Sequence, residues 1–369
     1  MIRSEAVHRA TYFWWKVAPL VTHYKFTKWW LRKTKAPLEK RDKIYNELHD
    51  KYAPIAYEVA LELKGLYVKL AQITSSRPDF VPPQYMELFV AAQDSLPQWP
   101  IEDVKEIIDA TLSGKDDHQL LSFESAFEDI DEIALGSASI GQCHKATIKG
   151  KYARELTGDD DDAAVAVDVA VKVMHPGAEQ RFRHDFQVFR WLCKVALTGW
   201  EPILDECYRQ IMSEFDYRKE ANSLDTIRKA MINSPFRKSI RVPKPVFELC
   251  GKEMLVMELF DGENMSDSLE NELSEILGKK KSKQLLERKR LQLILGKDKM
   301  KTLAATTDGE GKDGGDEESI LSECGWKTKF HLLGLYKRAQ KTIDLLVDVQ
   351  GYQMLKDGVF QGDPHPGEY

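Results

Sequence analysis

Three separated groups of residues have the types and spacing needed to handle the phosphates of a nucleotide. The first is the segment 136–143, in which Gly136, Ala138 and Gly141 follow the spacing of a kinase glycine-rich loop, with alanine in place of the middle glycine. Small residues, here with Ser139 between them, allow the backbone to approach phosphate oxygens closely. A tight hairpin turn explains the same residues, so this segment alone does not establish a phosphate site.

The second group is a strand that ends in a lysine. Residues 169–172 read Val-Ala-Val-Lys, the pattern of the strand that presents an ammonium group to nucleotide phosphates. The separation between the loop and Lys172 is longer than usual, and an exposed hairpin insertion predicted at 151–162 accounts for the excess. A carboxylate must hold this lysine, and Glu220, on a helix after the strand, is the predicted partner.

The third group lies near the end of the chain. Asp363 precedes Glu368 by five residues, the spacing of a kinase catalytic loop, whose second position normally carries a metal-binding Asn. A glutamate oxygen can still bind Mg²⁺, although an ordinary Asp-Pro turn explains the segment as well. The order of loop, strand lysine and late aspartate favours a kinase-like fold that binds ATP and Mg²⁺. The strand 254–258, ending at Glu258, fits a hinge whose backbone would bond the adenine ring.

Helices and a small sheet must position these groups. Apolar residues recur at helical spacing between 38 and 121, including a helix that starts at Ile101 directly after Pro100. Short segments rich in β-branched residues predict an antiparallel sheet, and helical periodicity returns on either side of the last strand. The predicted strands are 133–135, 137–148, 164–174 and 252–258, and the later helical segments are 179–232 and 330–355.

Two segments depart from the average composition. Residues 1–35 hold eight Lys or Arg and one Glu, a local charge of +7, interleaved with aromatic residues. This pattern predicts either a pair of amphipathic helices that pack on the fold or a peripheral contact with an anionic membrane surface. Residues 278–325 combine a basic and an acidic block of low complexity, which predicts a solvated and mostly disordered insertion.

The composition of the whole chain excludes several classes of protein. Its 369 residues are 43% hydrophobic and 30% charged, as in a soluble globular protein with a large core. The net charge of −6 argues against nucleic acid as a partner. Five cysteines without a CxxC pair argue against a disulfide scaffold and a cysteine-rich zinc site. The sequence contains no run of 18 apolar residues that would predict a transmembrane helix.

With these motifs in order, the chain resembles the UbiB family of atypical kinases, also called the ADCK or coenzyme-Q8 family. The most specific marker is the helix 63–72, which resembles the KxGQ motif of the family, with Ala71 in place of its glycine. The segments 75–85 and 93–97 resemble the part of the family sequence that comes after that helix. Residues 136–142 resemble the alanine-rich loop of the family, residues 214–216 its ExD motif, and residues 363–367 its catalytic loop.

The resemblance implies an α+β fold with the two lobes of a protein kinase, an N-terminal helical extension and an incomplete C-terminal lobe. The implied domains are a helical extension (1–121), an N-lobe with inserted helices (122–262) and a partial C-lobe (263–369). Lys69 and Gln72 would then occupy the place of a peptide substrate, with Glu214 and Asp216 holding Lys69.

The resemblance also implies an activity. Members of the family bind and hydrolyse ATP and support quinone-lipid synthesis in mitochondria, plastids or bacteria. It therefore implies an ATPase, or a kinase of lipids or small molecules, whose partners are a nucleotide and a lipid or quinone intermediate, in a mitochondrion or plastid.

This sequence departs from the family pattern near its end. Gln361 and Glu368 replace the usual residues of the catalytic loop, and the second metal-binding Asp would lie beyond Tyr369. We therefore expect a truncated chain that folds poorly and is catalytically inert. Two alternatives stay open: a nucleotide- or lipid-binding scaffold without catalysis, and a phosphotransferase of the aminoglycoside or choline type, against which the Lys69–Gln72 helix argues.

Overall fold

The structure divides into two compact units that are described separately. Unit 1 comprises Met1–Asp225 with Pro243–Leu259, and unit 2 comprises Thr226–Val242 with Phe260–Tyr369. The structure is a computed structural model, and it describes residues 2–75, 81–91, 98–114, 121–157, 166–196, 201–286, 289 and 324–360.

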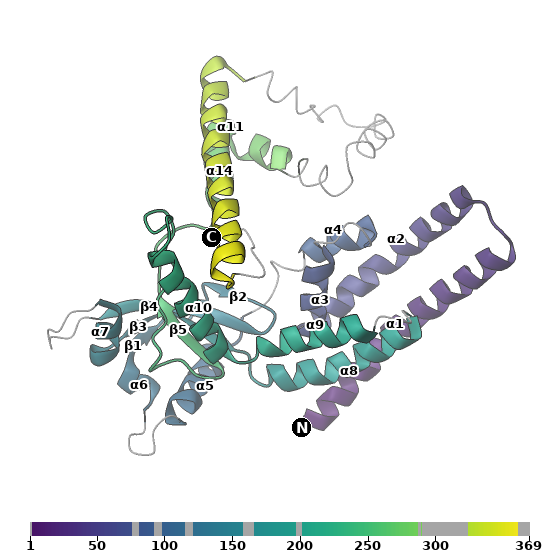
Figure 1. Cartoon of the computed structure of the whole chain (residues 1–369). Coiled ribbons are helices and arrows are strands. Elements are labelled where there is room, and N and C mark those ends of the chain that lie inside the picture. Colours follow the sequence, from purple (N-terminus) through teal and green to yellow (C-terminus); the bar gives the residue numbers. More distant parts are fainter. Residues whose placement is uncertain are drawn as a thin grey trace. The chain divides into compact units, whose positions relative to one another are not determined.

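Unit 1 contains an antiparallel sheet (Figure 1). Its strands lie in the order β1-β3-β4-β5, and β2 pairs with Gln142 and Cys143 at the N-terminal end of β3. On β4 the alternating Val169, Val171 and Val173 are all buried, and on β3 burial alternates from His144 to Ile148. The strands are β1 (Phe127–Ile130), β2 (Gly136–Ser137), β3 (Gly141–Ile148), β4 (Val167–Met174) and β5 (Met254–Glu258).

Three helices accompany the sheet: α5 (Ile101–Ser113), α6 (Phe123–Ala126) and α7 (Gly150–Thr157). The helix α5 starts directly after Pro100, as predicted, because proline lacks the N–H that a first helical turn leaves unpaired. Its apolar stripe packs against the inner residues of the strands to form the first core. The residues of α5 in that core are Val104, Ile108 and Leu112.

A second core joins the sheet to three further helices, α8 (Ala178–Ala196), α9 (Glu201–Ser213) and α10 (Tyr217–Ile232). Aromatic side chains dominate this core, and Phe182 packs against Phe215 with ring centroids 5.2 Å apart. These helices confirm the helical segment predicted at 179–232. Of the acidic residues of the site, Glu220 lies on α10, and Glu214 and Asp216 lie in the turn between α9 and α10.

The N-terminal helices of unit 1 are α1 (Ile2–Lys33), α2 (Leu38–Leu63), α3 (Leu66–Ser75) and α4 (Pro83–Ala91). The predicted pair of helices in residues 1–35 is wrong, because α1 continues through Pro19 and the chain turns only at 34–37. The helix survives its proline because it packs along both α2 and α8 (Figure 1). Its buried residues in this third core are Phe13, Val17 and Val21.

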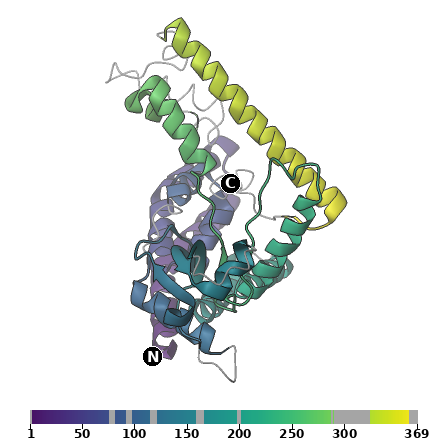
Figure 2. The ribbon, with the colours of Figure 1, turned by 90° about the vertical axis from the view of Figure 1, so that its left-hand side faces the viewer.

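In unit 2, the helices α11 (Met265–Leu277) and α14 (Trp326–Tyr352) lie side by side (Figure 2). Arg338 on α14 forms an ion pair with Glu272 on α11. A π-helical turn, Gln353–Asp357, follows α14, so the helix predicted at 330–355 is confirmed.

Several sequence-based boundaries need correction. Residues 133–135 form no strand. The edge strand is β1 instead, in which only the two end residues, Phe127 and Ile130, are buried. The predicted strand 137–148 is interrupted by the loop 138–140. The predicted hairpin at 151–162 begins as the helix α7, and residues 158–165 lie outside the described residues. The basic block is helical over 279–286, whereas most of the rest of 278–325 lies outside the described residues.

Among the described residues, no helix combines the length and the apolar character needed to cross a bilayer.

Candidate functional site

The sheet aligns the predicted loop with the predicted lysine. Gly136 on β2 pairs with Cys143 on β3, and Cys143 pairs with Lys172 on β4. The three residues therefore form one row across the strands. Gly141, at the other end of the loop, pairs with Met174, two residues beyond the lysine. The register places the start of the loop and the ammonium-bearing residue at the same level of the sheet.

Lys172 and its predicted partner are in contact. The Nζ of Lys172 donates to both carboxylate oxygens of Glu220 on α10, at 2.7 and 3.0 Å. The exposed fractions of the two side chains are 30% and 42%, so water reaches the pair. The Nζ also lies 4.9 Å from the ring centre of the buried Tyr217. Fixed from two directions and open on one side, the ammonium is placed to meet an anion.

Gly141 is required by packing. A Cβ at this position would lie 2.4 Å from the Oη of Tyr217 and 2.6 Å from the carbonyl oxygen of Val173. The turn that precedes it is closed by the N–H of Ala138, which donates to the carbonyl of Gly141 at 2.7 Å. Neither Gly136 nor Gly141 has a positive φ. The glycine at 141 therefore lets the loop lie directly on Tyr217, whose ring also contacts the Lys172 ammonium.

Cys143, between the loop and Lys172, does not have the character of a nucleophile. Burial raises the pKa of its thiol to about 11, although Lys172 acts in the opposite direction. The thiol stays protonated at neutral pH, and its small side chain serves as a spacer between the strands.

The KxGQ-like helix is tied to the acidic segment by one of its two predicted contacts. The Nζ of Lys69 on α3 donates to Glu214 at 3.1 Å. Asp216 does not hold Lys69; both of its carboxylate oxygens accept from the guanidinium of Arg218, at 2.8 and 2.9 Å. An arginine two residues away reaches Asp216 with a planar fork at little entropic cost, which explains the difference. Gln72 lies three residues after Lys69 on α3 and is half-buried.

The backbone N–H of Glu258 is engaged within the protein. That N–H donates to the carbonyl of Lys244 at 2.9 Å, and the Glu258 carboxylate accepts from the N–H of Lys244 at 3.4 Å. Glu258 directly precedes Leu259, the last residue of unit 1, and the hinge role of the strand 254–258 stays a prediction.

The predicted catalytic and metal-binding residues Asp363 and Glu368 lie outside the described residues. Within the described ranges, no group of three or more His, Cys, Asp or Glu side chains could hold a metal ion. The residues that are described therefore fit the phosphates of a nucleotide, whereas the metal would depend on Asp363 and Glu368.

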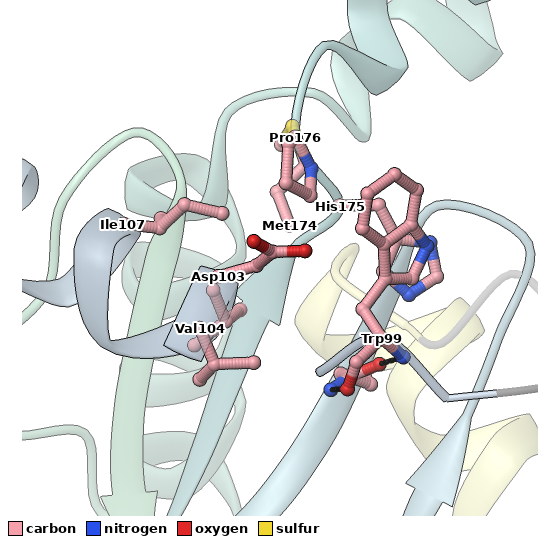
Figure 3. A pocket seen from close by; sticks show the side chains of 9 residues that line it. Trp99, Asp103, Val104, Ile107, Met174, His175 and Pro176 are labelled. Carbon is pink, nitrogen blue, oxygen red and sulfur yellow. Dashed lines mark hydrogen bonds between the residues drawn. The ribbon is translucent and has the colours of Figure 1, made fainter. Parts of the chain in front are cut away.

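Sequence reasoning missed a polar connection between the loop and the segment before α5. The side-chain amide of Gln142 accepts from the backbone N–H of Trp99 at 2.7 Å and donates to the carbonyl of Trp99 at 3.1 Å. The indole of Trp99 stacks on His175, with ring centroids 5.7 Å apart, and Figure 3 shows the two rings together. Only the Gln after the loop, within the family-like motif, signalled this contact in the sequence.

It also missed a buried ion pair. Arg9 on α1 bonds both carboxylate oxygens of Asp185 on α8 and donates to the carbonyl of Leu63 at 2.6 Å. Partners 176 residues apart leave no local pattern to find.

Comparison with known proteins identifies the family of the chain. The model of the ABC1 atypical kinase-like domain matches residues 91–297, more than half of the chain, and the chain belongs to this family. Proteins named for kinase activity are among its relatives, so the resemblance to the UbiB and ADCK group is confirmed. A mostly helical chain with a small antiparallel sheet and a kinase-like domain is thus established.

Three relatives illustrate how similar this chain is to known proteins in sequence and how much of each chain the similarity covers. Protein ACTIVITY OF BC1 COMPLEX KINASE 1, chloroplastic, from Arabidopsis thaliana is 29% identical over 54% of this chain and 27% of its own length. AarF domain-containing protein kinase 1 from Xenopus laevis is 24% identical over 67% of this chain and 43% of its own. The ABC1 family protein MCP2 homolog from Schizosaccharomyces pombe is 30% identical over 51% and 31%.

The matched part of the chain spans about a quarter to two fifths of the length of these relatives. A solved complex of Rv3197 with erythromycin from Mycobacterium tuberculosis is 24% identical, covers 64% of this chain and 58% of that chain, and has a TM-score of 0.36.

Proposed function

We propose that the chain is the ATP-binding part of an atypical kinase-like enzyme. The observation that carries the proposal is the row of Gly136, Cys143 and Lys172, completed by the ion pair with Glu220. In this proposal Lys172 binds nucleotide phosphates, the loop 136–141 lies over them, and Asp363 and Glu368 hold Mg²⁺. The metal, when bound, would neutralise the charge that develops on the transferred phosphoryl group.

The enzyme is proposed to be an ATPase or a kinase of lipids or small molecules that supports quinone or lipid metabolism. The contact of Lys69 with Glu214 supports this choice over a protein kinase. It fixes α3 against the segment that precedes α10, and in this proposal α3 occupies the place where a protein kinase would bind its peptide substrate. The alternative is a scaffold that binds nucleotide without catalysis, which Glu368 in place of Asn favours.

Calorimetric titration with Mg-ATP tests the nucleotide site. Lys172→Met should weaken binding by about tenfold or more, because the charge-assisted bonds to phosphate are lost. Lys145→Met is the matched control, since Lys145 lies on the neighbouring strand and pairs with the exposed Asp168. Equal affinity for the wild type and the Lys172 variant would exclude Lys172 from the site.

A separate measurement distinguishes enzyme from scaffold. Single-turnover hydrolysis of ATP should be lost in Asp363→Asn while binding of the nucleotide without metal is retained. Binding without turnover in the unmodified chain would favour the scaffold.

The proposed arrangement is the two-lobed one, with a helical extension (1–121), an N-lobe (122–262) and residues of a C-lobe (263–369). The end of unit 1 at Leu259, close to the end of the proposed N-lobe, supports it.

We further propose a plastid location, since several relatives are named chloroplastic. Import of the full-length protein into isolated chloroplasts rather than mitochondria tests that location.

We also propose a peripheral membrane contact through α1. Its C-terminal half leaves Phe26, Trp29 and Trp30 exposed, although its other face is packed. The neighbouring Lys25, Lys28 and Arg32 would attract anionic headgroups. Arg9, in the N-terminal half of α1, is engaged by Asp185.

Flotation with liposomes tests this contact. Binding should require anionic lipid and fall with salt, and Trp29→Ala should weaken it. Trp191→Ala is the matched control because Trp191 is an equally exposed tryptophan on α8. Equal recovery with neutral liposomes would contradict the electrostatic part of this proposal.

A further inference from the structure

A pocket of about 240 Å³ opens on the side of the loop that faces the helical extension. Its walls are the loop residues Ala138–Ile140, Glu5 and Arg9 of α1, the end of α2, Trp99, His175 and the start of α8. Lys172, Glu220 and Tyr217 do not line it. The volume corresponds to on the order of eight water molecules and is below the roughly 300–1,000 Å³ of a site for a drug-sized ligand. A compact ligand would fill it.

Arg181 is the strongest sign of a ligand in this pocket. Its guanidinium lies 5.4 Å from the ring of Trp99, and the side chain is half-buried. Among the described residues, its guanidinium has no hydrogen bond and no ion pair. Burial lowers the pKa of Arg181. Glu5 and Asp185 attract the guanidinium without forming an ion pair with it, so an acceptor placed between its donors would be strongly held.

A second polar group in the pocket lacks a partner. The Nε2 atom of His175 is buried, and none of the described residues bonds it. The imidazole is held against Trp99 by stacking. Lys64, at the end of α2, adds a positive charge close enough to lower the pKa of His175 together with Arg181. Its ammonium has no carboxylate partner among the described residues.

The negative charges of the pocket limit what can enter. Asp185 is already engaged by Arg9, and Glu5 and Glu62 are exposed. Two exposed carboxylates would repel a polyanion such as a triphosphate chain, whereas one small anion can be held deeper by Arg181 and His175. Charge and volume therefore agree on a single oxyanion.

We propose that this pocket binds one phosphate group, either free or as part of a small ester or lipid headgroup, through Arg181, Lys64 and His175. Arg181 would donate to two phosphate oxygens, and His175, as the tautomer protonated at Nε2, would donate to a third. Trp99 connects the pocket to the loop, because it stacks on His175 and its backbone bonds Gln142.

Titration of the full chain with inorganic phosphate tests the proposal, followed by calorimetry and by the imidazole NMR signals of His175. Arg181→Gln should weaken phosphate binding by about tenfold or more. Arg183→Gln is the matched control, because Arg183 lies on the same helix but bonds Glu179 and Tyr208. Lys172→Met should leave phosphate binding unchanged and separates this pocket from the nucleotide site.

Three further measurements decide the remaining cases. Phosphate should raise the pKa of His175 from about 4 in the wild type but not in Arg181→Gln, and Arg181→Lys keeps the charge if the glutamine variant does not fold. Glycerol 3-phosphate and vesicles with phosphatidic acid show whether an ester or a headgroup binds more tightly than free phosphate. Binding that survives Arg181→Gln, disappears with Lys172→Met, or is absent for all three probes would overturn the proposal.

Discussion

Two ion pairs connect the helices of unit 1 to one another and to its sheet, and they differ in how much water reaches them. Arg9 and Asp185 have exposed fractions of 13% and 4%, whereas those of Lys172 and Glu220 are 30% and 42%. A closed pair cannot exchange its partner without leaving a buried charge, but an open pair can turn toward a ligand at little cost. The closed pair therefore serves the fold, and the open pair is suited to a site.

Burial reduces the contribution of the Arg9–Asp185 pair to the stability of the fold, because both charges lose their hydration. Burial raises the pKa of Asp185 above its ordinary value, although Arg9 acts in the opposite direction. Its contribution lies mainly in the mutual neutralisation of two charges that the packing of α1 on α8 has removed from water.

The largest predicted effect is the loss of half of the closed pair. Arg9→Met should lower the free energy of unfolding by about 3–5 kcal/mol, because Asp185 would stay buried without its cation. Denaturant unfolding measures the change. The double variant Arg9→Met with Asp185→Leu should recover much of the loss, and Lys16→Met, which breaks the exposed pair with Glu58, should change stability by less than about 1 kcal/mol. A mild effect of Arg9→Met would remove the distinction between the two pairs.

Acid should test the same closed region with a smaller effect. Burial lowers the pKa of His175 to about 4 from 6.5, so the unfolded chain binds the proton more readily between these values. The stability is fully present above pH 6.5 and is lost as the pH falls toward 4, by at most on the order of 3 kcal/mol. His175→Gln should flatten this dependence. Asp185, with its raised pKa, contributes to the pH dependence with the opposite sign. Because both proteins keep Asp185, its contribution cancels in the difference between the two curves, which isolates His175.

The smallest predicted effects belong to the open pairs. Lys172→Met and Lys69→Met should each change the free energy of unfolding by less than about 1 kcal/mol, and salt should reduce even that change. Thermal unfolding at low and high ionic strength measures both. A loss as large as that of Arg9→Met would mean that these lysines hold the fold together, and would weaken their assignment to a ligand site.

The two pairs also mark what a sequence can and cannot reveal. The contact of Lys172 with Glu220 was predictable because a strand lysine and a helical acid occur in a recognisable order. Arg9 and Asp185 belong to no such pattern, and tertiary packing alone brings them together. The strand β1 was missed because its sequence, Phe-Glu-Asp-Ile, buries only Phe127 and Ile130 and shows no strict alternation. Arg218 displaced Lys69 from Asp216 because a neighbour in sequence needs no folding to reach it.

The pairing of Gln142 with the backbone of Trp99 has a consequence for the order of folding. A side-chain amide here takes the place of one rung of a strand ladder, and the two residues are 43 positions apart. Until the segment around Trp99 arrives, the Gln142 amide oxygen lacks this partner and the amide nitrogen keeps only its contact with His144, at 2.8 Å; an unmade bond of this kind costs roughly 1–3 kcal/mol. The sheet should therefore complete its order late and together with α5, as one cooperative step. Gln142→Glu would uncouple the sheet from α5. The loop 136–141 should then be among the first parts to open in hydrogen exchange.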